Sequence, residues 1–378
     1  MTTPTPTIAI IGGGIIGLSI AWALARAGHC PTVFDAGDMG RAASWAAGGM
    51  LAPDIETEAG EQTLSQLLFR ARASWPEFAS VLENSSGQKI YFQPRGSLFV
   101  ARDQDDIAKL QFLQELEIAL GLSPKWLSAY EAKKLEPHLG RNVIAALHHP
   151  DDAQVDNRAT VSALITACQK SGVVLLSHTK IVALHQTGNR VTGIRTAHET
   201  IAADIVILAA GAWSAQIKGL GTAAPPVRPV KGQMIALGHP ATGPLLEKLI
   251  WSAGVYLIPQ PDRLLIGASV EEMGFDTTQT AGPIMDLLHQ AYAILPGIYD
   301  LPVIETWAGL RPTSRDDAPI LGPTAIDGLI MATGHHRNGI LLAPLTAQII
   351  ADLVIGGQWP DYADNFLPSR FTNTQKAA

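Results

Sequence analysis

A glycine-rich turn between a short apolar run and an alanine-rich stretch constrains the fold of this chain more than any other feature. Residues 7–11 are mostly β-branched and predict a buried strand. The turn Gly12-x-Gly14-x-x-Gly17 follows, and residues 18–27 predict a helix that Gly28 ends. Residues 32–35 predict a second strand. The order strand, glycine turn, helix, strand is a right-handed βαβ unit of the kind that opens a doubly wound α/β fold.

The glycine turn predicts a binding site for a dinucleotide, with a purely structural turn as the alternative. Its glycines permit close approach of the backbone to a pyrophosphate and close packing of helix on strand. The helix N-terminus offers free N–H groups, and Asp35, 21 residues after Gly14, can accept hydrogen bonds from ribose hydroxyls. There is no second fingerprint, since residues 219–221 neither follow a strand nor open a helix. The choice at this point is a one-nucleotide NAD dehydrogenase or a flavoprotein that its substrate reduces directly.

The composition describes an acidic chain with ample material for a core. Its 378 residues predict two domains, and its net charge of −7 disfavours binding to nucleic acid or anionic lipid. Hydrophobic residues make up 47% of the chain and charged residues 16%, which excludes a disordered protein. Residues 8–25 carry no charge, but the glycines within them and the lack of a preceding Lys or Arg disfavour membrane insertion or export.

The cysteine and histidine content predicts neither a disulfide framework nor a metal site. Cys30 and Cys168 are the only cysteines, and we expect both to be buried apolar side chains in a cytoplasmic protein. His148-His149 precedes Asp151-Asp152, but this spacing lacks the i, i+4 geometry of metal ligands, so no metal is expected.

Further periodicities predict a second, mainly antiparallel unit. Alternating apolar residues and turn signals between residues 227 and 270 are typical of such a sheet. Helices are predicted at residues 61–83, 103–120, 159–169, 283–294 and about 342–354. Strands are predicted at residues 88–100, 173–176, 180–185, 191–195, 203–209 and 328–333.

Four stretches together resemble the D-amino-acid-oxidase-like flavoenzymes, and within them the glycine oxidases. They are the fingerprint through Asp35, residues 40–50 (GRAASWAAGGM), residues 307–312 (WAGLRP) and residues 334–344 (GHHRNGILLAP). Residues 229–234 (PVKGQM) add support. Because these stretches lie at both ends of the chain, the resemblance covers its whole length.

The resemblance implies an FAD-dependent enzyme with interleaved domains. A Rossmann-like α/β FAD-binding domain is expected to comprise residues 1–85, 142–222 and 308–378. A substrate-binding α+β domain built on a mainly antiparallel sheet is expected to comprise residues 86–141 and 223–307. FAD is expected to bind non-covalently. Neither cysteine lies where sarcosine oxidases attach their flavin, and residues 45–47 lack the histidine that anchors it in dimethylglycine dehydrogenases.

The resemblance also implies which residues contact FAD. The small residues Ala43, Ser44 and 46–49 would let backbone lie against the isoalloxazine ring. Ile181 would lie near the adenine, and residues 335–341 near the flavin ring. A helix beginning near Ile340 would direct its positive end at the flavin N1–C2=O2 locus, where charge accumulates on reduction. The expected contacts are Gly12, Gly13, Gly14, Ile15, Ile16, Gly17, Asp35, Ala36, Arg41, Ala43, Ser44, Ala46, Ala47, Gly48, Gly49, Met50, Ile181, Ala210, Gly211, Trp213, His335, His336, Arg337, Asn338, Gly339, Ile340 and Leu341.

Three side chains are implied in substrate binding and catalysis. Arg311 matches the arginine that binds the substrate carboxylate, a group that a guanidinium holds with two parallel N–H donors. Tyr256 matches a tyrosine whose hydroxyl assists, and Arg337 matches a second active-site arginine. Residues 264–270 have neither the Lys nor the His that sarcosine oxidases place there, and Gly254 has no side chain at a position that varies among glycine oxidases.

The implied reaction is oxidative deamination of glycine and other small amino acids or amines, such as sarcosine and small D-amino acids. Hydride passes from Cα to flavin N5 and O2 reoxidises the flavin. The products are the α-keto acid (glyoxylate from glycine), ammonia or an amine, and H2O2. The implied role is thiamine biosynthesis or amine catabolism, in a homo-oligomer.

Three alternatives stay open at this point. One is a D-amino-acid or D-proline dehydrogenase that passes electrons to a quinone. Another is the flavin domain of a tRNA-modifying enzyme, which the acidic net charge disfavours. The third is a non-catalytic flavoprotein, which would have no use for a carboxylate-binding arginine.

Overall fold

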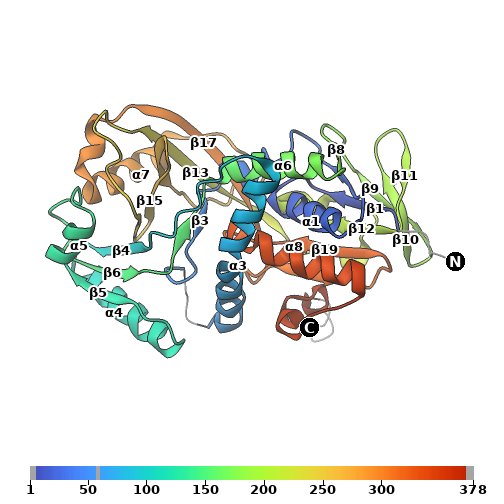
Figure 1. Cartoon of the computed structure of the whole chain (residues 1–378), viewed down its shortest axis with the longest axis horizontal. Helices are drawn as coiled ribbons and strands as arrows, with labels where there is room; N and C mark the ends of the chain where they lie inside the picture. The colour runs from blue at the N-terminus through green and yellow to red at the C-terminus, as the bar shows by residue number, and fades with distance from the viewer. Residues whose placement is uncertain (1–5, 57–59, 372–378) are drawn as a thin grey trace.

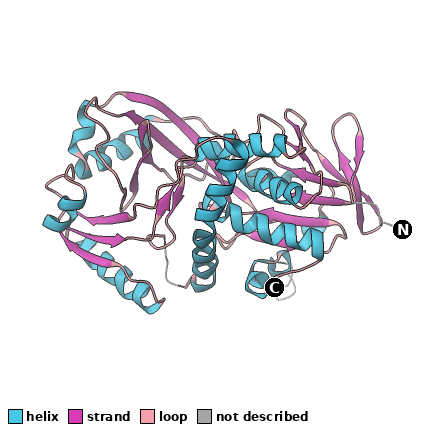
Figure 2. Cartoon of the chain, in the orientation of Figure 1, coloured by secondary structure: helices cyan, strands magenta, loops and turns pink. Residues whose placement is uncertain are grey.

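The computed structural model describes residues 6–56 and 60–371 of the chain. Two lobes lie side by side along the long axis of the molecule, one built on a six-stranded sheet and the other on an eight-stranded sheet (Figure 1). Helices and strands occur in both lobes, as Figure 2 shows. The fold is therefore a mixed α/β architecture, as the sequence predicts.

The six-stranded sheet has the order β18-β19-β12-β1-β2-β8. All its neighbouring strands are parallel except β18, which pairs antiparallel with β19. The strands are β1 (Ile8–Ile11), β2 (Thr32–Phe34), β8 (Val174–Leu176), β12 (Ile205–Leu208), β18 (Ile320–Pro323) and β19 (Leu329–Thr333). The glycine turn joins β1 to α1 (Ile15–Arg26), so the predicted βαβ unit forms the centre of this lobe.

The two faces of this sheet are covered differently, and β1 shows why. Ile8 and Ile10 point into a core shared with the helices α1, α3 (Gln62–Ser86), α6 (Asn157–Lys170) and α8 (Gly339–Gly356). Ala9 and Ile11 point to the other face and pack with residues of a small antiparallel sheet. That sheet consists of β9 (Ala183–Thr187), β10 (Arg190–Arg195) and β11 (Thr200–Ala202).

The most apolar segments of the chain are core elements of this lobe. Residues 8–25 divide into β1 and α1 and so form no continuous helix. Among the described residues, α8 alone is long and apolar enough to cross a membrane, yet it packs beside α1 and α3 and 61% of it is buried (Figure 1). Burial inside the lobe accounts for its composition.

The eight-stranded sheet has the order β17-β13-β16-β15-β14-β4-β6-β5 and is antiparallel except between β14 and β4. One face packs against α7 (Ala281–Ile294) and the other against α4 (Gln104–Ala119). The strands are β4 (Ser97–Ala101), β5 (Lys125–Ser128), β6 (Ala145–His149), β13 (Arg228–Gly238), β14 (Leu249–Ser252), β15 (Val255–Pro259), β16 (Arg263–Gly267) and β17 (Val303–Thr313).

The remaining elements are short. They are α2 (Ala43–Ala46), α5 (Ala129–Leu135), the strand pair β3 (Met50–Leu51) and β7 (Ala153–Gln154), and 3-10 helices at Gly211–Gln216, Gly221–Ala223, Pro296–Asp300, Asp361–Phe366 and Pro368–Phe371.

The structure corrects two predicted domain boundaries and one predicted burial. The boundary at residue 142 is too early, because β6 pairs with β4 and β5 in the eight-stranded sheet. The boundary at 308 divides β17, which pairs along its length with β13. Cys168 is buried as expected, but Cys30 is exposed because it lies in the turn between α1 and β2.

Candidate active site

A cavity of about 1200 Å³ lies where the two sheets meet. From the six-stranded sheet it receives the carboxyl ends of β1, β2, β12 and β19, the edge at which α/β proteins bind ligands. From the eight-stranded sheet it receives residues of β13, β15 and β17. One cavity therefore joins the glycine turn to the side chains predicted to bind substrate.

The glycine turn is tightly packed around the start of α1. A Cβ atom at Gly12 or at Gly17 would collide with a backbone carbonyl, that of Ala209 or of Gly12 respectively. Gly14 stands at the N-cap of α1 and provides no side chain to cover the N–H groups of the first turn. Only glycine fits at positions 12 and 17. The Ser44 hydroxyl accepts a hydrogen bond from the Ile15 N–H at 2.9 Å, and Gly14, Ile15 and Ile16 line the cavity, where the start of the helix can meet an anionic group.

Asp35 at the end of β2 holds the glycine turn in place. One of its carboxylate oxygens accepts a hydrogen bond from the Gly13 N–H at 2.8 Å, and the other accepts from the Gly37 N–H at 2.9 Å. Asp35 also lines the cavity. It therefore braces the turn in addition to standing where the sequence predicts a ribose contact.

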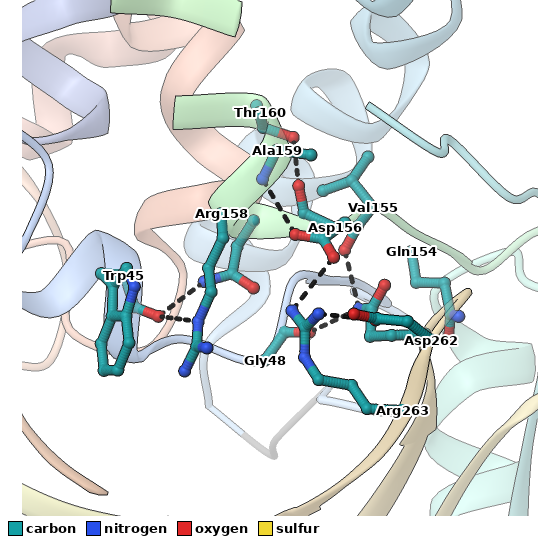
Figure 3. Close-up of polar contacts among 12 residues, drawn as sticks. Trp45, Gly48, Gln154, Val155, Asp156, Arg158, Ala159, Thr160, Asp262 and Arg263 are labelled. Atoms are coloured by element: carbon teal, nitrogen blue, oxygen red, sulfur yellow. Dashed lines mark hydrogen bonds and ion pairs between the residues drawn. The ribbon is translucent and has the colours of Figure 1, made fainter. Parts of the chain in front are cut away.

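Residues 43–49, all small except Trp45, form another wall of the cavity. Hydrogen bonds to their backbone carbonyls hold them in place, and Figure 3 shows those at Trp45 and Gly48. The side-chain amide of Asn157 donates to the carbonyls of Ser44 at 2.8 Å and Trp45 at 3.0 Å. That of Gln260 donates to the Gly48 carbonyl at 3.2 Å. These bonds come from both lobes, so the segment has little freedom to move away from a ring placed against it.

An ion pair between the lobes supports the same wall. Arg263 of β16 lies 3.0 Å from the carboxylate of Asp156, which also caps α6 through the Ala159 N–H (Figure 3). Both side chains are largely buried. Removing one partner of such a pair strongly destabilises the protein, because the other charge stays buried without compensation.

The segment leading into α8 closes the cavity opposite this wall. His335 is fully buried, bonds to the Thr346 hydroxyl at 3.1 Å, and is kept neutral because burial lowers its pKa to about 3. Gly339 and Ile340 open α8 and line the cavity. The helix N-terminus thus faces the interior, as the sequence predicts.

Arg311 of β17 lies across β13 at the far end of the cavity. Its Nη1 donates to the carbonyls of Lys231 at 3.3 Å and Ser269 at 3.1 Å. Gly232 makes room for the guanidinium, since a Cβ there would lie 2.5 Å from Nη1. These two bonds orient Nη1, and the guanidinium also interacts with the Tyr256 hydroxyl, so both side chains face the same end of the cavity, where a carboxylate could meet them.

Tyr256, Arg337 and Glu56 complete this end. Tyr256 of β15 directs its hydroxyl at the Met234 sulfur at 3.3 Å. Burial raises the pKa of its phenol, an effect that the positive charge of Arg311 opposes and the negative charge of Glu56 reinforces. The Arg337 Nε lies 3.0 Å from the Glu56 carboxylate. Tyr256 is therefore protonated at neutral pH, and Arg337 forms an ion pair with Glu56.

Most of the predicted site residues lie together on this cavity wall, and four do not. Gly13 and Gly17 are buried within the glycine turn, and Asn338 is the N-cap of α8. Leu341 packs in the core, and its carbonyl accepts a hydrogen bond from the Trp75 indole at 2.9 Å. Those on the wall are Gly12, Gly14, Ile15, Ile16, Asp35, Ala36, Arg41, Ala43, Ser44, Ala46, Ala47, Gly48, Gly49, Met50, Ile181, Ala210, Gly211, Trp213, Tyr256, Arg311, His335, His336, Arg337, Gly339 and Ile340.

Several residues of the cavity wall lie outside the predicted site. Glu56 belongs to no motif, and its partner Arg337 lies 281 positions away, so no local pattern could reveal it. Gly232 stands within the stretch 229–234, whose central glycine was a usable signal. Met234, Trp251 and Thr333 also line the cavity.

Comparison with known proteins places the chain in a family. Residues 7–353 match the family model described as DAO, FAD dependent oxidoreductase. The glycine oxidase of Geobacillus kaustophilus is 34% identical over 351 residues, which cover 92% of each chain. The crystal structure of glycine oxidase from that organism matches with a TM-score of 0.91 and 33% identity, over 97% of this chain and 98% of that one.

A second group of relatives is longer. The bifunctional protein ThiO/ThiG of Trichormus variabilis is 37% identical over 371 residues, which are 97% of this chain and 55% of that protein. The chain thus spans about half the length of such relatives. Its glycine turn, the two helix N-termini that line the cavity and the wall of mostly small residues all fit a dinucleotide that carries a flat ring. The chain belongs to the DAO family of FAD-dependent oxidoreductases.

Proposed function

We propose that this protein oxidises small amino acids, glycine and sarcosine among them, in the manner of a glycine oxidase. The observation that carries the proposal is that the Arg311 guanidinium opens into the same cavity as the glycine turn. A carboxylate-binding group is thereby placed within one enclosed space with the FAD-binding residues. The relatives named glycine oxidase support the same assignment.

The side chains at the substrate end divide the work of binding. Arg311 would hold the substrate carboxylate through its outward N–H groups, while the Lys231 and Ser269 carbonyls keep the guanidinium flat. The neutral phenol of Tyr256 would donate to the same carboxylate. Met234 and Trp251 would exclude water around Cα.

The cofactor would be held mainly by backbone. The glycine turn and the N-terminus of α1 suit the pyrophosphate, residues 43–49 suit the isoalloxazine, and the N-terminus of α8 suits its pyrimidine edge. When bound, FAD supplies the acceptor for the hydride that leaves the substrate Cα. For glycine the balanced reaction consumes O2 and water and yields glyoxylate, ammonia and H2O2.

The test is an anaerobic visible spectrum of the FAD-loaded protein before and after millimolar glycine. Loss of the oxidised-flavin bands supports the proposal. Bands that persist with glycine but vanish with a bulkier D-amino acid would move the substrate to that class. Bands that persist with every small amino acid tried would refute the proposal.

The electron acceptor is tested separately. We propose O2, with one H2O2 formed for each substrate oxidised. Turnover with a quinone and no H2O2 would instead support the dehydrogenase. We further propose a cytoplasmic homo-oligomer, and we favour thiamine biosynthesis over amine catabolism because of the relatives named ThiO/ThiG.

A further inference from the structure

The substrate end of the cavity carries a small set of charges. Here this end means the wall formed by β13, β15, β17, Glu56 and residues 335–337. The charged side chains that the described residues contribute to it are Arg311, Arg337 and Glu56. The other charged residues of the cavity wall belong to the six-stranded lobe, and they are Asp35, Asp38, Arg41, Lys180 and Lys218.

Glu56 and Arg337 form a two-point contact. The Arg337 Nε lies 3.0 Å from the Glu56 carboxylate, and its Nη2 donates to the Glu56 backbone carbonyl at 3.3 Å. The Glu56 side chain is 6% exposed, so it has left water to meet this arginine. The Arg337 side chain is 31% exposed, so this pair is partly buried and is screened less than one at the surface.

The segment that carries Glu56 is anchored two residues earlier. The Asp54 carboxylate lies 2.7 Å from Arg72 of α3, which also approaches Asp152 at 3.5 Å. These side chains hold residues 54–56 against the body of the protein. The anchored segment therefore positions the Glu56 carboxylate beside Arg337.

The other titratable groups at this end are neutral. Burial, followed by the charges of Arg337, Arg311 and Arg228, lowers the pKa of His336 to about 3. Burial and Glu56 raise the pKa of the Tyr256 phenol. The described side chains at the substrate end thus sum to a charge of +1, which comes from Arg311 once Glu56 has neutralised Arg337.

We propose that Glu56 is a specificity-determining residue that matches the site to substrates with one carboxylate and disfavours substrates with two. This inference rests on the proposed function. An amino acid with a neutral amine and a neutral side chain carries one negative charge, which Arg311 balances. A second carboxylate would need Arg337, which Glu56 already holds, and it would lie beside the Glu56 carboxylate without compensation.

The test compares two substrates that differ by one carboxylate, sarcosine (N-methylglycine) and iminodiacetate (N-carboxymethylglycine). The ratio of their kcat/KM values is measured for the wild type and for Glu56→Gln. We expect the wild type to prefer sarcosine, and the substitution to shift the ratio toward iminodiacetate by at least about 10-fold. The matched control is Glu247→Gln, which removes a carboxylate paired with Arg95 at 3.9 Å outside the cavity and should leave the ratio unchanged.

A binding measurement separates this inference from the proposed function. Calorimetry on the FAD-loaded wild type compares acetate with malonate at a pH where malonate is fully ionised. Acetate binding at least about 10-fold tighter than malonate supports the inference, even if no amino acid is oxidised and the proposed function fails. Equal binding of the two anions, or an unchanged substrate ratio in Glu56→Gln, would overturn it. If the variant does not fold, the comparison of the two anions decides.

Discussion

Glycine at position 232, which has no side chain, allows the Arg311 guanidinium to lie against strand β13. Gly232 of β13 pairs with Gly309 of β17, so neither strand raises a side chain between them at this point. The guanidinium occupies the space above Gly232, where a Cβ would lie 2.5 to 2.7 Å from Nη1, Nη2 and Cζ. The orientation of Arg311 therefore depends on the absence of a Cβ atom at Gly232.

Replacing Gly232 with alanine should displace Arg311 without unfolding the protein. We expect KM for glycine to rise by about 10- to 100-fold, because a small displacement of a positioned group has effects of that size. FAD content should stay at the wild-type level, since the three atoms nearest a Cβ at Gly232 all belong to the Arg311 guanidinium. Steady-state kinetics and flavin absorbance give both values.

The control for this substitution is Gly282→Ala in the first turn of α7. A Cβ there meets nothing within 4 Å, so the same chemical change falls in open space. An unchanged KM in Gly232→Ala would show that Arg311 does not bind the substrate.

His335 gives the stability of the protein a pH dependence. Its imidazole is neutral in the fold because burial lowers its pKa from 6.5 to about 3. Below about pH 6.5 the His335 imidazole binds a proton in the unfolded chain but stays neutral in the folded chain. This difference lowers the free energy of unfolding as the pH falls toward about 3.

Replacing His335 with glutamine should remove this contribution. The amide can still bond to Thr346, and it does not titrate. We expect the melting temperature of the variant to fall less than that of the wild type between neutral and mildly acidic pH, as calorimetry would show. The exposed His198→Gln is the control, and an equal fall in all three proteins would contradict the assignment.

At the scale of elements, α8 is a core helix whose N-terminal turn lines the cavity. The helix is buried along most of its length between α1 and α3, and this burial fixes where its first turn lies. Gly339 at that turn faces the cavity, and a Cβ there would meet only the His335 Cβ at 3.7 Å. A longer side chain would be tolerated by the helix and would extend into the space assigned to the flavin.

Gly339→Leu should therefore weaken FAD binding with little loss of helix. We expect the Kd for FAD to rise by about 10- to 100-fold, the equivalent of the 1–3 kcal/mol typical of overpacking. Quenching of flavin fluorescence measures the Kd, and circular dichroism reports the helix. Gly356→Leu at the other end of α8 should leave both unchanged, and equal FAD affinity in Gly339→Leu would place the flavin elsewhere.

At the scale of the whole molecule, the interleaved chain places both thiols away from the cavity. Cys30 lies exposed in the turn before β2, and the Cys168 thiol donates to the Leu18 carbonyl at 3.4 Å in the core. Burial raises the pKa of the Cys168 thiol to about 12, so it is not a nucleophile at neutral pH.

We expect FAD to leave the protein on acid precipitation. The supernatant should contain all the flavin absorbance and the pellet should be colourless, because neither thiol reaches the cavity wall. Flavin fluorescence on a denaturing gel provides an independent check. A yellow pellet or a fluorescent band would show a covalent bond and contradict the prediction.

Features that depend on neighbouring residues were predictable from the sequence. The βαβ unit, the dinucleotide turn, the helix over about residues 342–354 and the mainly antiparallel second sheet follow from local spacing, because periodicity and glycine placement set backbone conformation and burial over a few residues. The family resemblance added Arg311, Tyr256 and Arg337, and the structure brings them together at one end of one cavity.

The tertiary structure alone decided the partners and the boundaries. Glu56 meets Arg337 across 281 positions, β6 joins the second sheet through β4 and β5, and β17 runs across a predicted domain boundary. Such pairings have no local signature, because they arise when distant segments are brought together by burial of the two cores. The sequence alone therefore determined most of the central elements and their fit to a dinucleotide, and the family resemblance pointed to FAD. The packing of the two lobes decided which charges the substrate meets.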